Sequence, residues 1–291
     1  MKDLKQPTTK KIIPYIIGDI HGCFETYKLL EKKISTHAKK LGSAPFVISV
    51  GDLIDRGGYS FDVVDHFVRG NLEGTHIALL GNHEVELLKN IYAVKPSLFD
   101  NAKSPFPWYL DTFDTEYVGD VCNVMNLEEY KIFQRIHWYF QGGVEALKSY
   151  RCDPKEPRDW NFPIEHIRFL SNMPLLWENE SIVVTHGFAK GHDLEHIKCF
   201  VKDYSAEKPP SDPELRTTYM ESVHNAIWSR RPPHIPVYEK RLHISGHTPV
   251  QKVRRMPSLN ELQIDTGCVY GRRLTAYCTE VDQVISVKSI G

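Results

Sequence analysis

Five short apolar runs in this chain each end in a turn that carries acidic, amide or imidazole side chains. The runs are 15–17, 46–50, 76–80, 182–185 and 242–245, and the turns read GDIHG, GDLIDRG, GNHE, THG and GHT. Short β-branched runs bounded by such turns predict strands, and the helical patterns between several of them predict βαβ units. Because ligands of open α/β sheets bind beyond the carboxyl ends of the strands, these turns are expected to meet in one site.

Apolar residues at three-to-four spacing predict helices after the first two strands. One helix covers 24–41, and another covers 61–69, with Ser60 as its N-cap and Gly70 just beyond its end. Pro14 cannot donate to a sheet ladder, so we expect the first strand to begin at Tyr15. Apolar runs near 242, 262, 274 and 284, with weak helix signals, predict that the C-terminal part is mainly strand.

We expect one domain over 12–291, preceded by a polar tail at 1–11. Within this domain, 92–180 is predicted to be a mainly helical insertion that caps one end of the sheet. Its aromatic start, 99–109, is expected to form the core of the insertion, with a substrate lid as the alternative. A helix is predicted over 127–140, before a Gly142-Gly143 break, and its shared face would carry Tyr130, Phe133, Ile136 and Phe140.

Composition narrows the class of protein. The 36 basic and 37 acidic residues give a net charge of −1, which argues against a protein that binds nucleic acid over its whole surface. No apolar stretch approaches the ~20 residues of a membrane span, and the N-terminus lacks the apolar core of a secretory signal. We therefore expect a cytoplasmic enzyme with no membrane or nucleic-acid partner, and the sequence leaves its oligomeric state open.

The side chains in the five turns favour metal chemistry. Carboxylate and amide oxygens mixed with imidazole nitrogens suit two borderline divalent ions. Two such ions ~3.5–4 Å apart can hold the attacking and the leaving oxygens of a phosphoryl transfer. The fourteen histidines of the chain, more than structure alone requires, point the same way.

The five turns, in this order, resemble the motifs of the calcineurin-like metallophosphoesterase superfamily and, within it, of the bacterial PPP-type serine/threonine protein phosphatases. The resemblance spans roughly 15–278. It implies an α/β fold in which a metallophosphoesterase-type β-sandwich is flanked by helices, in α/β/β/α order, with a helical insertion. It also implies a dinuclear metal centre at the edge of the sheets.

The same resemblance implies the metal ligands. The first ion would be bound by Asp19 and His21, both ions by Asp52, and the second ion by Asn82, His186 and His247. We expect two Mn²⁺ ions, with iron and zinc as alternatives, because all three accept these ligands. A hydroxide bridging the ions would attack phosphorus in line, without a phosphoenzyme intermediate.

The remaining roles also follow from the resemblance. His83 would protonate the leaving oxygen, and Asp55 would orient His83. Arg56 would bind the phosphate oxygens, for which a planar guanidinium is suited. A second phosphate-binding arginine is expected at Arg230, and its neighbour Arg231 is the alternative.

Two details of the motifs favour a protein substrate carrying phosphoserine or phosphothreonine. Asp55 precedes Arg56, and Glu84 follows His83, whereas the tetraphosphatases usually differ at both positions. The stretch 264–276, IDTGCVYGRRLTA, resembles a tail that the PPP-type phosphatases share with the symmetric bis(5'-nucleosyl)-tetraphosphatases, so it does not decide between them and a dinucleotide polyphosphate is the alternative substrate. Related folds also hydrolyse 2',3'-cyclic nucleotides, which is a third possibility.

Structural interpretations compete for several of these residues. Asp55 and Arg56 could form a simple ion pair, and Glu84 is expected to be structural rather than catalytic. His192 and His196 have a metal-like helical spacing, but no carboxylate-and-histidine set accompanies them, so we expect solvated or capping roles.

Overall fold

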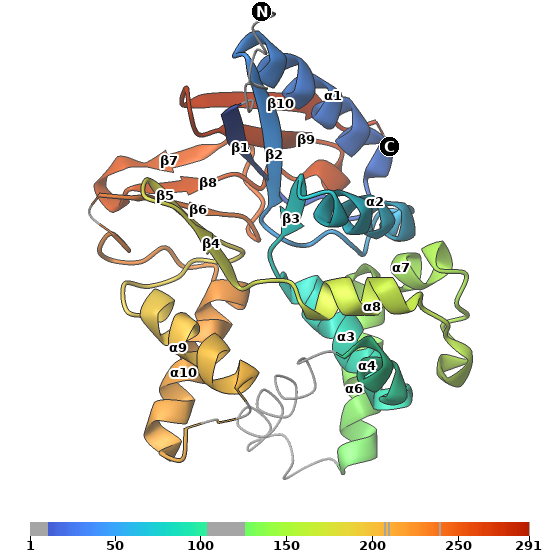
Figure 1. Ribbon diagram of the computed structural model, residues 1–291. Helices are drawn as coiled ribbons and strands as arrows, with labels where there is room; N and C mark the ends of the chain where they lie inside the picture. Colours follow the sequence, from blue (N-terminus) through green and yellow to red (C-terminus); the bar gives the residue numbers. More distant parts are fainter. Residues whose placement is uncertain (1–10, 104–125, 207, 209, 239, 291) are drawn as a thin grey trace, which may run out of the picture.

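The computed structural model describes residues 11–103, 126–206, 208, 210–238 and 240–290 (Figure 1). Its first mixed sheet has the strand order β10-β9-β1-β2-β3. In chain order these strands are β1 (Lys11–Ile17), β2 (Ser43–Ser49), β3 (His76–Ala78), β9 (Arg273–Cys278) and β10 (Gln283–Lys288). The strands β1, β2 and β3 are parallel, as the predicted βαβ units require.

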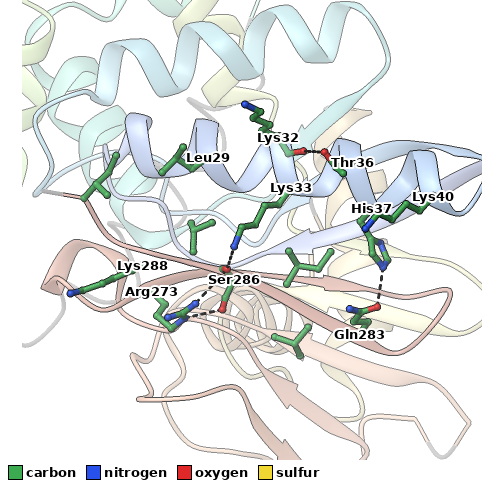
Figure 2. A pocket seen from close by; sticks show the side chains of 14 residues that line it. Leu29, Lys32, Lys33, Thr36, His37, Lys40, Arg273, Gln283, Ser286 and Lys288 are labelled. Carbon is green, nitrogen blue, oxygen red and sulfur yellow. Dashed lines mark hydrogen bonds between the residues drawn. The ribbon is translucent and has the colours of Figure 1, made fainter.

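Two helices cover the outer face of this sheet. Helix α1 (Phe24–Lys40) buries Tyr27, Leu30, Ile34 and Ala38, the residues whose spacing predicted it. Helix α2 (Ser60–Leu72) lies beside it over β3. Figure 2 shows how α1 is tied to the C-terminal hairpin, where Lys33 donates to the carbonyl of Ser286 at 3.1 Å and His37 contacts Gln283 at 2.9 Å.

The second sheet has the order β4-β5-β6-β8-β7. It consists of β4 (Leu176–Glu178), β5 (Ile182–Thr185), β6 (Leu242–Ser245), β7 (Arg254–Met256) and β8 (Glu261–Gln263). The central strands β5, β6 and β8 are parallel. Helices α9 (Asp193–Ser205) and α10 (Pro213–Trp228) pack against each other beside this sheet (Figure 1).

The two sheets face each other across an apolar core. Alternation along β1 sets this arrangement, because Ile16 joins the core between the sheets while Tyr15 and Ile17 join the core beneath the helices. The inter-sheet core is completed by side chains of both sheets, namely Ile48, Val50, Leu79, Ile182, Val184, Ile244, Leu262, Ile264 and Tyr277. The predicted α/β sandwich flanked by helices is confirmed.

In the sequence, further helices connect β3 to β4, and they lie at one end of the sandwich (Figure 1). They are α3 (Asn82–Val94), α4 (Ser97–Ala102), α6 (Leu127–Trp138), the short π-helical segment η1 (Tyr139–Gly143), α7 (Val144–Ser149) and α8 (Ile164–Ser171). Phe99 of the aromatic cluster is buried, whereas Phe106, Trp108 and Tyr109 lie outside the described residues. No helix in the described part of the chain has the length and apolarity to cross a membrane.

Three local predictions are wrong. Strand β1 begins at Lys11 rather than Tyr15. The carbonyl of Pro14 accepts from the backbone amide of Thr279, just beyond the end of β9. The N–H that Pro14 lacks would point to the same side, where the pairing of β1 with β9 ends. Ser60 is the first residue of α2 rather than its cap, and Gly70 lies inside this helix.

The face predicted for the helix over 127–140 is also not the buried one. Phe133, Ile136 and Phe140 are exposed, whereas Trp138 is fully buried. Helix α6 therefore anchors itself through Trp138, whose indole points toward the turn after β2.

Candidate metal centre

The polar turns of both sheets converge at one edge of the sandwich. Those of the first sheet follow β1, β2 and β3, and those of the second follow β5 and β6. The structure buries all of the side chains predicted to bind metal, namely Asp19, His21, Asp52, Asn82, His186 and His247. It buries the predicted proton-donor pair, His83 and Asp55, beside them.

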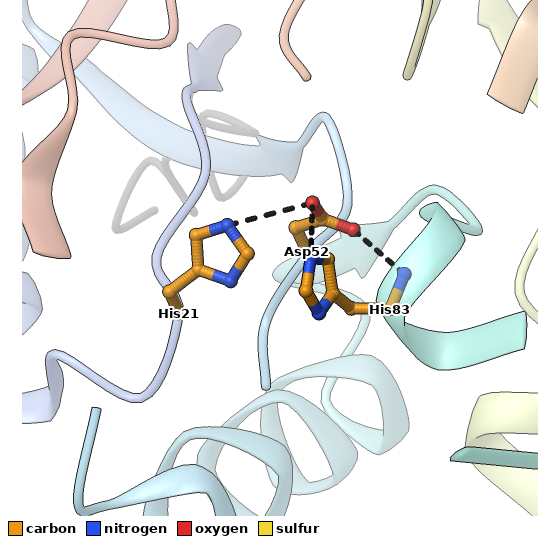
Figure 3. Close-up of side chains that lie close together, drawn as sticks. All are labelled: His21, Asp52 and His83. Carbon is orange, nitrogen blue, oxygen red and sulfur yellow. Dashed lines mark hydrogen bonds and ion pairs between the residues drawn. The ribbon is translucent and has the colours of Figure 1, made fainter. Parts of the chain in front are cut away.

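Asp52 lies at the centre of this site (Figure 3). Its Oδ2 is 3.5 Å from Nε2 of His21 and 3.9 Å from Nε2 of His83, and its Oδ1 is 3.3 Å from Nε2 of His186. Two groups of potential ligands result, His21 with Asp52 and His83, and Asp52 with His186 and His247; within each, the ligand atoms lie within 4.8 Å of one another. A carboxylate that belongs to both groups could bind two metal ions at once.

Backbone carbonyls fix the ring tautomers of three histidines. Nδ1 of His21 is 2.8 Å from the carbonyl of Ile54, and Nδ1 of His186 is 2.9 Å from the carbonyl of Val50. Nε2 of His247 is 3.1 Å from the carbonyl of Trp228. A carbonyl only accepts, so in the neutral ring each of these nitrogens carries the proton, and the other nitrogen can offer its lone pair to a bound ion.

Asp19 and Asn82 complete the predicted set. Both carboxylate oxygens of Asp19 accept from the amide of His247, at 3.2 and 3.1 Å, and Oδ1 of Asn82 is 3.2 Å from Nε2 of His186. Asp19 belongs to neither three-residue group and lies at their edge. Its approach depends on Gly246, because a Cβ at that position would lie 2.3 Å from Oδ1 of Asp19.

The electrostatics of the site favour added positive charge. Burial and then the neighbouring Asp265 raise the pKa of Asp19, and burial raises the pKa of Asp265 to about 6. Burial would lower the pKa of His186, but the Asp52 carboxylate outweighs it and raises this pKa to about 9. Buried carboxylates are costly unless cations compensate them, so these residues fit divalent metal ions.

The backbone of the site is strained. Nine described residues other than glycine have positive φ, and five of these are predicted site residues, namely His21, Asp52, Asp55, Arg56 and His247, with φ between 46° and 69°. Such conformations cost free energy and persist only where the surrounding structure enforces them. Their concentration here indicates that side-chain placement outweighs local backbone preference.

His83 is held differently from the other histidines. Its Nδ1 is 2.6 Å from Oδ2 of Asp55, and the same oxygen accepts from Nε1 of Trp138 at 2.9 Å. Burial raises the pKa of Asp55 and lowers that of His83 to about 4, so neither group favours its charged form and the pair titrates as a unit. Because Asp55 contacts His83, an ion pair with Arg56 cannot be the only role of Asp55.

Trp138 was not identified from the sequence. It reaches Asp55 across 83 residues, and the adjoining Gly142 accepts from the amide of Arg56 at 3.1 Å. A Cβ on Gly142 would lie 2.5 Å from that amide nitrogen, so only glycine permits the contact. The segment around 138–142 thereby supports the turn that carries Asp55 and Arg56.

Glu84 has a structural role. One of its carboxylate oxygens accepts from the amide of Leu53 at 2.7 Å, and the other accepts from the amides of Asp52 and Gly81 at 2.9 and 3.0 Å. Burial, followed by the charge of Asp52, raises the pKa of Glu84 to about 8, and the amide donors oppose that rise. Glu84 thus joins the turns after β2 and β3 and carries no information about the substrate.

The two predicted arginines border the site. Nη1 of Arg56 is 2.5 Å from Nε2 of His21, and Nη1 of Arg230 donates to the carbonyl of His247 at 3.4 Å. The carbonyl of Arg231 accepts from the Ser229 hydroxyl at 3.3 Å, a contact within its own loop. The guanidinium of Arg230 therefore contacts a predicted metal ligand.

Asp265 is a further residue that sequence reasoning missed. It follows β8 at the same sheet edge, is buried, and accepts from the amide of Gly267 at 2.9 Å. Its position just beyond a strand end, within the IDTG sequence, was the available signal.

A family model for calcineurin-like phosphoesterases matches residues 15–251. The chain belongs to this family. Its members use divalent metal ions in a dinuclear site, and the two groups that share Asp52 agree with such a centre. The protein is therefore a hydrolytic metallophosphoesterase.

Several named relatives are similar to this family member. Proteins named bis(5'-nucleosyl)-tetraphosphatase PrpE [asymmetrical] from Anoxybacillus flavithermus and Bacillus subtilis are 24% and 23% identical, covering 94% of this chain and 93% of each relative. A symmetrical bis(5'-nucleosyl)-tetraphosphatase from Buchnera aphidicola is 35% identical over 99 residues, which are 34% of this chain and 31% of the relative.

Solved structures share the fold of this metallophosphoesterase. A candidate diadenosine tetraphosphatase aligns with a TM-score of 0.52 at 17% identity, covering 98% of this chain and 97% of the other. A cold-active protein-tyrosine phosphatase of a psychrophilic Shewanella aligns with a TM-score of 0.52 at 12% identity, covering 96% and 79%.

Replacing Glu84 by Gln should lower the free energy of unfolding by about 1–3 kcal/mol, measured by urea denaturation at about pH 9, above the pKa of about 8 at which the Glu84 carboxyl ionises. In either orientation, the NH₂ of the new side chain would face a backbone amide that now donates to the carboxylate. The exposed Glu73→Gln is the control and should change stability by less than about 0.5 kcal/mol. Equal stability of the two variants would contradict this role for Glu84.

Replacing Trp138 by Phe should lower kcat about tenfold with little change in KM, because Asp55 loses a donor to its ionised form. The pKa of the Asp55–His83 pair should rise, moving the matching limb of the pH–rate profile to higher pH. Trp160→Phe is the control, since buried Trp160 contacts Trp138 but donates to the carbonyl of Asp153. Identical pH profiles for the two variants would refute a positioning role for Trp138.

Proposed function

We propose that this metallophosphoesterase hydrolyses bis(5'-nucleosyl) tetraphosphates. The observation that carries the proposal is the similarity to relatives of that name over 94% of the chain. This substrate was the alternative in our sequence analysis, and we now prefer it to a phosphorylated protein.

The proposed metal ligands are those expected from the sequence, all of which are buried at the centre. Asp52 would bind both ions, Asp19 and His21 the first, and Asn82, His186 and His247 the second. Manganese remains our proposed metal. Bound ions would supply the positive charge that acidifies a water and neutralises the phosphate oxygens.

The chain itself would supply proton transfer and phosphate binding. The Asp55–His83 pair holds a dissociable proton, and Nε2 of His83 faces the centre near Asp52. His83 could therefore protonate the leaving oxygen while Asp55 maintains the ring orientation. Arg56 contacts His21 and Arg230 contacts His247, so both guanidinium groups border the proposed centre and would bind phosphate oxygens.

A serine/threonine phosphoprotein is the second candidate substrate, and the His83–Asp55 pair is the observation that favours it. A serine or threonine alkoxide is a strongly basic leaving group and needs a proton in the transition state. The phosphate that leaves a polyphosphate chain is a weak base and needs one far less. A buried donor held at 2.6 Å from its carboxylate partner is suited to the more demanding reaction.

A substrate panel on manganese-loaded protein separates these functions. We expect diadenosine tetraphosphate to be hydrolysed with a higher kcat/KM than a phosphoserine peptide or a 2',3'-cyclic nucleotide. Chromatography of the products gives the cleavage position, since symmetrical cleavage yields only ADP and asymmetrical cleavage yields ATP with AMP. Turnover of the phosphopeptide without turnover of diadenosine tetraphosphate would overturn the proposal in favour of the second candidate.

His83→Ala sharpens this panel. General acids contribute about 10²–10⁴-fold to rate, so the variant should lose that factor on a phosphopeptide. It should lose much less on diadenosine tetraphosphate, because the leaving phosphate needs little protonation. Equal losses on both substrates would remove His83 from the role of leaving-group acid.

A further inference from the structure

A second group of metal-ligating side chains lies away from the catalytic centre. Oε1 of Glu31, on α1, is 2.7 Å from Nε2 of His66, on α2, and 3.2 Å from Nε2 of His76, on β3. All three ligand atoms lie within 4.8 Å of one another. His76 begins β3, whereas Asn82 and His83 follow the other end of that strand, so this zinc-type cluster of Glu31, His66 and His76 occupies the opposite edge of the sheet.

Hydrogen bonds aim the His76 ring at the cluster. The Thr75 hydroxyl donates to the carbonyl of Gly70 at 3.1 Å, and its oxygen is 2.8 Å from Nδ1 of His76. With the hydroxyl proton given to that carbonyl, the oxygen accepts from Nδ1–H. Nε2 of His76 then carries the lone pair, which accepts from the Tyr27 hydroxyl at 2.9 Å and which a bound metal ion would take over.

The packing of α2 provides room for this ring. A Cβ on Gly70 would lie 2.2 Å from Nδ1 of His76. Glycine within a helix lowers helix stability, and here it permits the imidazole to lie against the helix backbone. This arrangement is the reason that α2 contains Gly70 instead of ending before it.

The surroundings and access of the cluster also suit a cation. The buried Tyr27 hydroxyl lies 2.9 Å from Nε2 of His76 and 3.3 Å from Oε1 of Glu31, so it could donate to the carboxylate once an ion occupied the ring nitrogen. Side-chain exposures of 21% for Glu31 and 26% for His66 leave a path from solvent.

We propose that Glu31, His66 and His76 bind one Zn²⁺ ion, separate from the catalytic ions, that links α1, α2 and β3. Two imidazoles with one carboxylate are a ligand set that zinc accepts, and a water would complete the tetrahedron. Ligand bonds of about 2.0–2.1 Å place neighbouring ligand atoms roughly 3.3 Å apart. The contact of Glu31 with His76 already has this separation, and that with His66 would lengthen slightly.

Zinc stoichiometry tests the site. Full-length protein stripped by a chelator is dialysed against buffered micromolar Zn²⁺, and bound zinc is counted by elemental analysis. Wild type should bind one more ion per chain than His66→Gln, which keeps a donor for Glu31 but removes the ligand. His37→Gln is the matched control, because His37 also lies on a helix face and contacts Tyr15 and Gln283, and it should retain the wild-type count.

Thermal unfolding with and without Zn²⁺ gives an independent reading. At zinc concentrations about 100 times the Kd, the melting temperature of wild type should rise roughly 5–10 °C more than that of His66→Gln. Glu31→Gln should behave as His66→Gln does, and it covers the case in which His66→Gln fails to fold. Equal zinc counts and equal melting shifts in wild type and a folded variant would show a metal-free hydrogen-bonded cluster and overturn the proposal.

Discussion

The contact of one buried carboxylate, Asp52, with imidazoles from both sheets is the interaction on which the site depends. His21 comes from the first sheet and His186 from the second, and both lie within 3.5 Å of Asp52. The apolar core between the sheets brings their strand ends together and so creates this meeting point. Because a buried carboxylate needs compensating charge, the same geometry that defines the sandwich also defines a cation site.

The surrounding residues stabilise this arrangement, although its backbone conformation is energetically unfavourable. Glu84 joins the turns after β2 and β3 through three backbone amides, and Trp138 fixes Asp55 from outside the sheets. Positive φ at Asp52 and Asp55 is tolerated only because such contacts enforce it. The side chains of the site are therefore positioned by contacts with neighbouring residues rather than by the local conformational preference of the backbone.

The sequence predicted the strands that carry the site, the first two helices and the turns of the site, because apolar periodicity and strand-end polarity are local signals. It missed β4, which lies within the stretch 92–180 that was expected to be mainly helical. It did not reveal Trp138, whose partner Asp55 is 83 residues away, or Asp265, whose role depends on the approach of the second sheet. Pro14 and Gly70 were misinterpreted for the same reason. Pro14 lies where the pairing of β1 with β9 ends, and Gly70 lies against the ring of His76. These tertiary contacts override the usual tendency of proline to end a strand and of glycine to end a helix.

The bridging position of Asp52 is tested most directly by counting metal in an Asp52→Asn variant. Wild type and variant are stripped, dialysed against manganese and compared by elemental analysis. An amide offers one neutral oxygen where the carboxylate offers two that share a negative charge, so the variant should bind about two fewer manganese ions per chain than wild type. A folded Asp52→Asn protein with the full wild-type manganese content would contradict the central role of this carboxylate.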